Sequence, residues 1–235
     1  MGILGGTFNP PHVGHLALAR HARAELDLER VLLMPASVAP NKPVAHEDPG
    51  AEHRLQMCRL AVAHEPGVEA SALEIERGGV SYTVDTLQAI HDEQPDAELT
   101  LIVGADTART LPGWREPARL LELAGLAVAE RDEPGCEDVQ EALLSVALPA
   151  VPGAPDPAPG VGPQPRITLL KMDRVAVSSS FVREQIAAGE PVGELVGEAV
   201  AGYIAEHGLY RSGDTSHSID ASDLGETSAT IGGNT

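Results

Sequence analysis

The sequence predicts an α/β fold with a doubly wound parallel sheet, and two observations carry that prediction. Short apolar runs of strand length alternate along the chain with longer stretches that have the amphipathic period of helices. In addition, 235 residues with 43% hydrophobic content are enough to bury one substantial core. We therefore expect one domain that carries the whole α/β pattern.

Each element follows from its own stretch of sequence. After the short apolar opening, four apolar runs have the length of buried strands: 31–34, 99–103, 126–129 and 167–170. Amphipathic stretches predict helices at about 14–26, 51–64, 83–91, 118–123, 137–144, 181–188 and 194–206. Ligands of open parallel sheets bind outside the carboxyl ends of the strands, so the residues just after each strand are candidates for a site.

Two segments lack this alternation. Prolines recur every few residues among Gly and Ala at about 149–165, a composition that blocks helix and ladder hydrogen bonds and predicts an insertion. Residues 212–235 are rich in Ser, Thr, Gly and Asp and poor in apolar side chains, which predicts a disordered acidic and polar tail. The predicted organisation is one domain at 1–211, interrupted by the insertion and followed by the tail.

Composition narrows the range of partners. The formal charge of −19 repels a nucleic-acid backbone, and no Lys- or Arg-rich stretch with aromatic residues offsets it. An acidic chain still binds a small phosphorylated ligand where a few cations line the pocket. The sequence has no apolar run of membrane-spanning length and no secretory signal, so a cytoplasmic protein is expected. Cys58 and Cys136 are isolated and indicate free thiols, and a homo-oligomer is left open.

Residues 5–15 read Gly-Gly-Thr-Phe-Asn-Pro-Pro-His-Val-Gly-His and precede the first predicted helix. Glycine lets backbone N–H groups approach an anion closely, and the helix that follows presents its positive N-terminal end. His12 and His15 lie at i, i+3, where imidazoles can donate hydrogen bonds to phosphate and gain positive charge as a leaving group departs. The predicted triphosphate site combines these histidines with Gly5, Gly6, Thr7, Phe8 and Gly14.

Other interpretations of this loop make different demands. A structural turn with two incidental histidines needs no ligand at all. A zinc site through His12 and His15 needs further ligands, and no nearby cysteine pair or suitable carboxylate supplies them. A Walker A loop is excluded because Gly-Lys-Ser/Thr is missing, and the spacing is not the Gly-x-Gly-x-x-Gly of dinucleotide folds.

His12, Gly14 and His15 match the His-x-Gly-His signature of the nucleotidyltransferases, and residues 5–15 most closely resemble the bacterial nicotinate-nucleotide adenylyltransferases. This resemblance implies a Rossmann-like sheet of the nucleotidyltransferase type with a small C-terminal helical part. It also implies adenylyl transfer from ATP to nicotinate mononucleotide, a step of NAD biosynthesis that releases pyrophosphate. Asn9, where the family more often has Asp, is implied at nicotinate mononucleotide.

The segment Ser-Tyr-Thr-Val-Asp-Thr-Leu at 81–87 is similar to a run that, in this family, opens a helix whose backbone amides receive the nicotinate carboxylate. The resemblance therefore implies Tyr82 and Thr83 at nicotinate mononucleotide. A helix N-terminus favours a carboxylate over a neutral amide, which would select the nicotinate form of the nucleotide. The alternative is an ordinary helix N-cap, since Ser, Thr and Asp are common there.

Gly104, Asp106 and Trp114 follow the predicted strand at 99–103. The resemblance implies that Gly104 and Asp106 contact the bound nucleotides, with Asp106 on a ribose hydroxyl. Trp114 is the single tryptophan, and its ring could stack on the pyridine ring for about 1 kcal/mol. Packing of Trp114 in the core is the alternative.

The segment Val-Ser-Ser-Ser-Phe-Val-Arg at 177–183 is similar to the family motif Ile-Ser-Ser-Thr-x-Ile-Arg. The resemblance implies that Ser179 and Ser180 contact ATP and that Arg183 is a catalytic cation. These residue types suit phosphate because serines at a helix start leave N–H groups available and Arg adds a fork of donors. A serine-capped helix with a solvated Arg is the alternative.

Lys42 and Arg54 complete the implied set of cations. Lys42, in a Pro-Asn-Lys-Pro loop, is implied as catalytic, and Arg54 in the next predicted helix is implied at nicotinate mononucleotide. Arg131 matches a family Arg-Pro-Gly only loosely because Asp132 and Glu133 intervene, so no role is assigned to it.

The implied reaction is direct in-line transfer with Mg²⁺ accompanying ATP and no protein metal ligands. His12 and His15 would stabilise the α-phosphate and the leaving group, while Lys42 and Arg183 would neutralise the β- and γ-phosphates. Two other functions are kept: a phosphopantetheine adenylyltransferase, and a nucleotide-binding sensor without catalysis. The run at 81–87 and Trp114 disfavour the first, and the intact cations disfavour the second.

Overall fold

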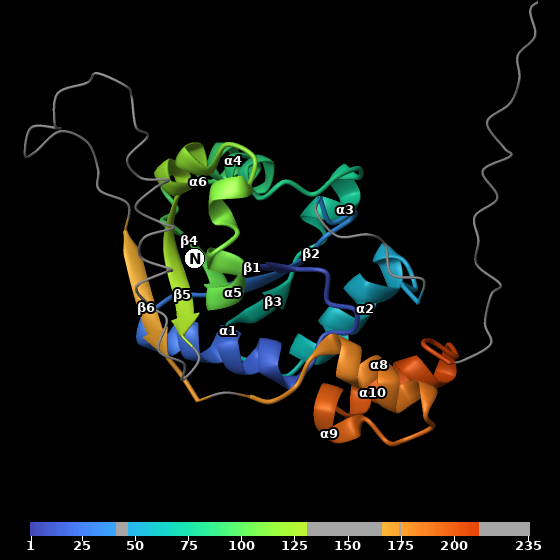
Figure 1. Cartoon of the computed structure of the whole chain (residues 1–235). Helices are drawn as coiled ribbons and strands as arrows, with labels where there is room; N and C mark the ends of the chain where they lie inside the picture. Colours follow the sequence, from blue (N-terminus) through green and yellow to red (C-terminus); the bar gives the residue numbers. More distant parts are fainter. Residues whose placement is uncertain (41–46, 131–165, 174, 212–235) are drawn as a thin grey trace, which may run out of the picture.

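A six-stranded parallel sheet with helices on both faces forms the centre of the molecule (Figure 1). The computed structural model describes residues 1–40, 47–130, 166–173 and 175–211. Its strands are β1 Gly2–Gly6, β2 Val31–Pro35, β3 Val68–Ala70, β4 Leu99–Gly104, β5 Ala124–Glu130 and β6 Ile167–Lys171. The order β3-β2-β1-β4-β5-β6 confirms the predicted Rossmann-like sheet, and the strand order reverses between β1 and β4, where sheets of this type bind ligands.

The helices alternate with the strands as the sequence pattern predicts. They are α1 Val13–Glu25, α2 Ala51–Val62, α3 Leu73–Arg77, α4 Thr83–Glu93, α5 Ala105–Ala108, α6 Pro117–Leu123, α8 Ser179–Ala187, α9 Gly193–Val196 and α10 Glu198–Glu206. A 3₁₀ turn, η1 Leu111–Gly113, precedes α6. The short elements β3, α3 and α5 are absent from the sequence prediction because three to five residues are too few to establish a period.

Alternate side chains of the central strands β1 and β4 enter two separate cores. Ile3, Leu101 and Val103 pack with α4 and α6, while Leu4 and Ile102 pack with α1 and α2. Figure 1 shows α4 and α6 on one side of the sheet and α1 on the other. Because both faces are covered, the strands are apolar on both sides, and this is why they appear in the sequence as continuous apolar runs.

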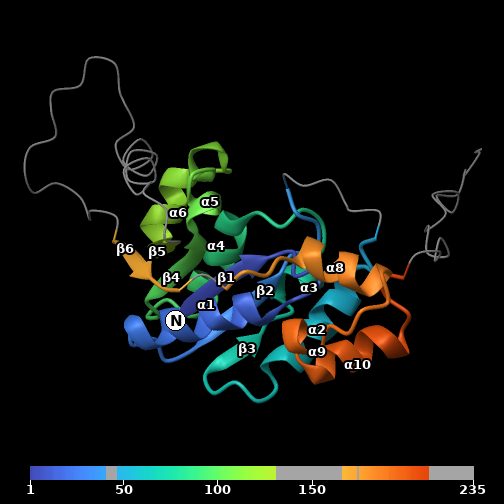
Figure 2. The ribbon, with the colours of Figure 1, turned by 60° about the horizontal axis from the view of Figure 1, so that its bottom comes forward.

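The C-terminal helices form a third core against α2, which confirms the small C-terminal helical part (Figure 2). Met57 of α2 is fully buried there among Val182, Val196 and Val200. The single helix predicted at 194–206 is wrong, because Gly197 has φ +86° and divides it into α9 and α10. The apolar period continues across the break, so both pieces still face the same core.

Several predictions fall outside the described residues: the helix at 137–144, the insertion at 149–165, the tail from 212, and Cys136. Cys58 is fully buried, and burial raises the pKa of its thiol, so it is a core residue. Among the described helices, none is long and apolar enough to cross a membrane.

Candidate active site

A cavity of about 500 Å³ opens at the carboxyl ends of β1 and β4. The reversal of strand order at this place in the sheet predicts a ligand site there. The cavity gathers predicted site residues from separate parts of the sequence. The predicted residues that line it are Gly5, Gly6, Thr7, Phe8, Asn9, His12, Gly14, His15, Arg54, Gly104, Ser179, Ser180 and Arg183. Their contacts with substrates remain predictions.

The turn after β1 is shaped by close packing around one aromatic ring. Phe8 has φ +51°, is 2% exposed, and lies with its ring centroid 4.8 Å from that of His15. A Cβ on Gly6 would approach the Phe8 ring to 3.2 Å. A Cβ on Gly14 would lie 3.1 Å from His12 Nδ1 and 3.1 Å from Val177 Cγ1. Glycine at both positions therefore lets the loop close tightly over the start of α1.

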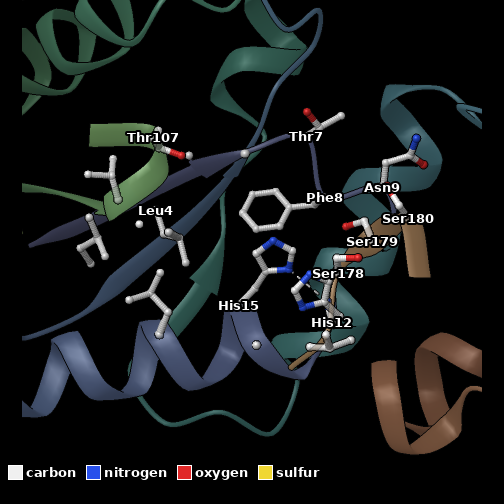
Figure 3. Close-up of a pocket in the computed structure, with 18 of the residues that line it drawn as sticks. Leu4, Thr7, Phe8, Asn9, His12, His15, Thr107, Ser178, Ser179 and Ser180 are labelled. Carbon is white, nitrogen blue, oxygen red and sulfur yellow. Dashed lines mark hydrogen bonds between the residues drawn. The ribbon is translucent and has the colours of Figure 1, made fainter. Parts of the chain in front are cut away.

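The rings of His12 and His15 are stacked at the start of α1, with their centroids 3.7 Å apart (Figure 3). The backbone N–H of His12 donates to His15 Nδ1 at 3.2 Å. Because a backbone N–H can only donate, Nδ1 of His15 is the acceptor, and the proton of the neutral ring lies on Nε2. His15 is thereby held as an Nε2–H donor, which suits a phosphate oxygen.

His12 is almost completely buried, and desolvation lowers the pKa of its imidazole to about 4. The ring is therefore neutral at neutral pH, and its nitrogens are available as a hydrogen-bond donor and an acceptor. Its Nδ1 is buried without a hydrogen-bond partner in the part of the chain that the structure describes. A buried polar atom left unpaired is unfavourable and is tolerated chiefly at functional positions.

The start of α8 is tied to the loop after β1, on the His12 side of the cavity (Figure 3). Ser178, rather than Ser179 or Ser180, caps the helix by accepting a hydrogen bond from the Phe181 N–H. The Ser179 hydroxyl donates to the Pro10 carbonyl at 2.8 Å. Ser178 was missed in the sequence, although its place before the helical stretch is typical of an N-cap.

Asn9 lies at the junction of this loop with the C-terminal segment. Arg183 Nη1 donates to the Asn9 carbonyl at 2.8 Å, and the Tyr210 hydroxyl donates to Asn9 Oδ1 at 2.7 Å. Asn9 and Tyr210 are both buried. Tyr210 was missed in the sequence, where its only signal is that it is the last large apolar residue before the polar tail. Asn9 and Arg183 therefore have structural contacts in addition to their predicted contacts with substrate.

Arg54 is only 3% exposed and donates four hydrogen bonds. It donates to Asp48 Oδ1 and to the carbonyls of Thr7, Ala36 and Ser37, at distances from 2.7 to 3.0 Å. The guanidinium thus joins the loops that follow β1 and β2. Its predicted contact with nicotinate mononucleotide stays a prediction, and bracing of these two loops is a role that the sequence does not reveal.

Three of the five residues predicted at nicotinate mononucleotide are not among the described residues that line this cavity: Tyr82, Thr83 and Trp114. Tyr82 precedes α4 and Thr83 begins it, and no described side chain caps that helix. The guanidinium carbon of Arg115 lies 4.8 Å from the Tyr82 ring centroid, and Arg115 Nη1 lies 3.2 Å from Asp85 Oδ2. Arg115 was missed, although a cation directly after Trp114 is a visible signal.

Trp114 and Asp106 both have partners within the protein. Trp114 packs partly buried against the core beside α4 and α6, and its Nε1 donates to Thr110 Oγ1 at 3.0 Å. Asp106 is paired with Arg109 at 2.9 Å. Their predicted contacts with the pyridine ring and a ribose stay predictions. Lys42 and Arg131 lie outside the described residues.

Within the described ranges, no group of three or more His, Cys, Asp and Glu side chains is placed to hold a metal ion. The stacked His12 and His15 therefore have no third protein ligand in this part of the chain to form the zinc site considered above. The cavity instead presents imidazole, guanidinium, hydroxyl and backbone groups, a set that suits phosphate oxygens.

Known proteins are similar to this chain along most of its length. The cytidylyltransferase-like family matches residues 3–185. The probable nicotinate-nucleotide adenylyltransferase of Roseiflexus sp. (strain RS-1) is 43% identical over 211 residues, covering 90% of this chain and 98% of the relative. The protein of the same name from Herpetosiphon aurantiacus is 40% identical, covering 89% and 98%.

A solved structure shares the fold at lower identity. Plasmodium falciparum nicotinic acid mononucleotide adenylyltransferase complexed with NaAD has a TM-score of 0.67 and 16% identity, covering 89% of this chain and 96% of that chain. The strand order and the stacked histidine pair at the start of α1 fit the family that the sequence relatives indicate. The chain therefore belongs to the cytidylyltransferase-like family and, within it, to the nicotinate-nucleotide adenylyltransferases.

Proposed function

We propose that this chain transfers the adenylyl group of ATP to nicotinate mononucleotide, forming nicotinate adenine dinucleotide and pyrophosphate. The observation that carries the proposal is the cavity at the β1–β4 reversal, where His12, His15 and Arg183 converge from the two ends of the domain. The names of the Roseiflexus and Herpetosiphon relatives support this choice of substrates, as does the complex of the Plasmodium protein with NaAD.

In the proposed reaction, an oxygen of the nicotinate mononucleotide phosphate attacks the α-phosphorus of ATP. A new P–O bond forms, the bond from the α-phosphorus to the bridging oxygen breaks, and pyrophosphate leaves with the bonding electrons. The attacking phosphate is already ionised, so the protein needs no general base and acts by positioning and by stabilising charge. His15 donates through Nε2–H, a tautomer imposed by its contact with the His12 N–H.

The cations of the proposed site act on the phosphates of ATP. Arg183 keeps one contact with the Asn9 carbonyl, and its fork has further donors for the β- and γ-phosphates. Lys42 is proposed to join it there. Mg²⁺ is proposed to enter as the MgATP complex, because Mg²⁺ prefers oxygen ligands and triphosphate oxygens supply them; its chemistry is to neutralise the departing phosphates.

The test is pyrophosphate release by the purified protein with ATP and Mg²⁺, with three acceptors compared at matched concentrations. Fast release with nicotinate mononucleotide alone supports the proposal in full. Equal rates with nicotinamide mononucleotide would keep the reaction but reject selection of the carboxylate by α4. Release only with phosphopantetheine would identify the other adenylyltransferase, and ATP binding without release would identify a sensor.

A further inference from the structure

Glu74 of α3 is a buried carboxylate that the proposed mechanism does not use. Its side chain is 6% exposed and lies against α4, where Thr86 Oγ1 donates to Glu74 Oε1 at 2.6 Å. Burial raises the pKa of this carboxyl, while hydrogen bonds from Thr86 and Ser81 act in the opposite direction. A buried carboxylate is unfavourable unless it is well hydrogen-bonded, so the placement of Glu74 requires these partners.

The hydrogen bonds around Glu74 have defined directions. The Ser37 N–H donates to Ser81 Oγ at 2.9 Å. The Ser81 hydroxyl hydrogen is then available to the Glu74 carboxyl, whose pKa Ser81 lowers. On the other side, Arg77 Nη2 donates to Thr86 Oγ1 at 3.0 Å, which leaves the Thr86 hydrogen for Glu74. Two chains of donors therefore end on one acceptor, the Glu74 carboxylate.

These chains join the start of α4 to the cavity wall. Ser81 also donates its backbone N–H to the Val38 carbonyl at 2.9 Å, and Val38 pairs with Val80 in an isolated parallel bridge. Ser37 and Val38 line the cavity. Thr86 lies in the first turns of α4, which begins at Thr83. Glu74 thus fastens the first turn of α4 to the loop that follows β2.

We propose that Glu74 is a positioning residue for the acceptor, holding the N-terminal turn of α4 where it meets the carboxylate of nicotinate mononucleotide. This inference rests on the proposed function. The loop at 5–15 is held independently of Glu74, because Arg54 donates directly to the Thr7 carbonyl. Loss of the Glu74 carboxylate therefore loosens the N-terminal turn of α4 and leaves the loop at 5–15 in place.

The experiment compares steady-state kinetics of wild type, Glu74→Gln and Glu76→Gln. The amide introduced by Glu74→Gln keeps the size of the side chain but opposes donors to the hydroxyls that need an acceptor. Glu76 lies exposed on the same helix and is the matched control. We expect Glu74→Gln to raise KM for nicotinate mononucleotide about tenfold, with kcat and KM for ATP within about twofold, and Glu76→Gln to match wild type.

Ser81→Ala is the second variant. It removes the Ser81 hydroxyl but leaves the Glu74 carboxylate its hydrogen bond from Thr86. It should also raise KM for nicotinate mononucleotide. The double variant should show little more than the larger single effect, since both substitutions remove the contact between Ser81 and Glu74. A lower Tm with unchanged KM in Glu74→Gln, or in Ser81→Ala if the first variant does not fold, would overturn the inference and leave a purely structural role. Absence of wild-type activity would instead overturn the proposed function.

Discussion

Single glycines in the site are required by contacts as well as by backbone conformation. Gly14 does not occupy the left-handed region, yet a Cβ there would lie 3.1 Å from both His12 Nδ1 and Val177 Cγ1. The residue at position 14 must therefore be small for the His12 ring to lie beside the second residue of α1. This explains Gly14 without reference to the family.

Replacing Gly14 with Ala should separate activity from stability. We expect kcat to fall about tenfold because His12 must move, whereas alanine favours the helix by up to about 1 kcal/mol and keeps Tm near the wild-type value. Gly202→Ala in α10 is the control, because its Cβ would meet no atom within 4 Å. A Gly14→Ala enzyme with wild-type kcat would show that the packing of His12 does not affect the reaction.

His12 makes stability depend on pH. Its pKa is lowered from 6.5 in the unfolded chain to about 4 in the folded protein, so the unfolded state binds the extra proton first. The contribution of His12 to the free energy of unfolding should be constant above pH 6.5 and fall between pH 6.5 and 4 by on the order of 2–3 kcal/mol. Urea unfolding of wild type and His12→Gln across this range measures the difference. Parallel curves for the two proteins would contradict the buried neutral imidazole.

At the scale of elements, α2 does more than cover the sheet. Its Met57 packs with the C-terminal helices, its Cys58 packs beneath the sheet, and its Arg54 binds two loops at the cavity. Three nearby residues of one amphipathic helix thus contact three different parts of the fold. The sequence predicts the helix from its period, but the period does not reveal which face meets which neighbour.

Replacing Arg54 with Ala should destabilise the fold. The change leaves Asp48 and the carbonyls of Thr7 and Ala36 without their buried donor, a loss of about 3 kcal/mol in the free energy of unfolding. Arg59→Ala on the exposed face of α2 should change it by less than about 0.5 kcal/mol. Chemical denaturation measures both, and equal effects of the two substitutions would refute the bracing role.

At the scale of the whole molecule, the two ends of the domain meet at the site. Tyr210 binds Asn9 across 201 positions of sequence, and Arg183 binds the same residue across 174. Tyr210 also belongs to the core that joins α2 to the C-terminal helices. The last described residues therefore support the loop that carries the histidine pair.

Two truncations test where the working domain ends. A chain of residues 1–211 should keep kcat/KM within about twofold of the full chain, because it retains Tyr210. A chain that ends at Gly208 loses that buried ring and its hydrogen bond, and should unfold several degrees lower and bind substrates more weakly. Loss of activity on removing 212–235 alone would contradict the predicted boundary.

Local sequence predicts most of the architecture. Strands β2, β4, β5 and β6 are visible as apolar runs, and most helices as amphipathic stretches, because burial leaves regular patterns of apolar residues. The break at Gly197 is not visible in this way, because an apolar period on both sides conceals an interruption of one residue. The motifs at 5–15 and 177–183 are also visible, because the residues within each motif are close to one another in sequence.

The sequence alone establishes the α/β class and the family to which the chain belongs, and it predicts a phosphate-binding loop at 5–15. Only the tertiary structure decided that Arg54 braces two loops, that Tyr210 supports Asn9, and that Glu74 receives two chains of hydrogen bonds. The physical reason is that period and capping depend on neighbouring residues, whereas buried hydrogen bonds depend on which distant segments the folded sheet brings within about 3 Å of one another.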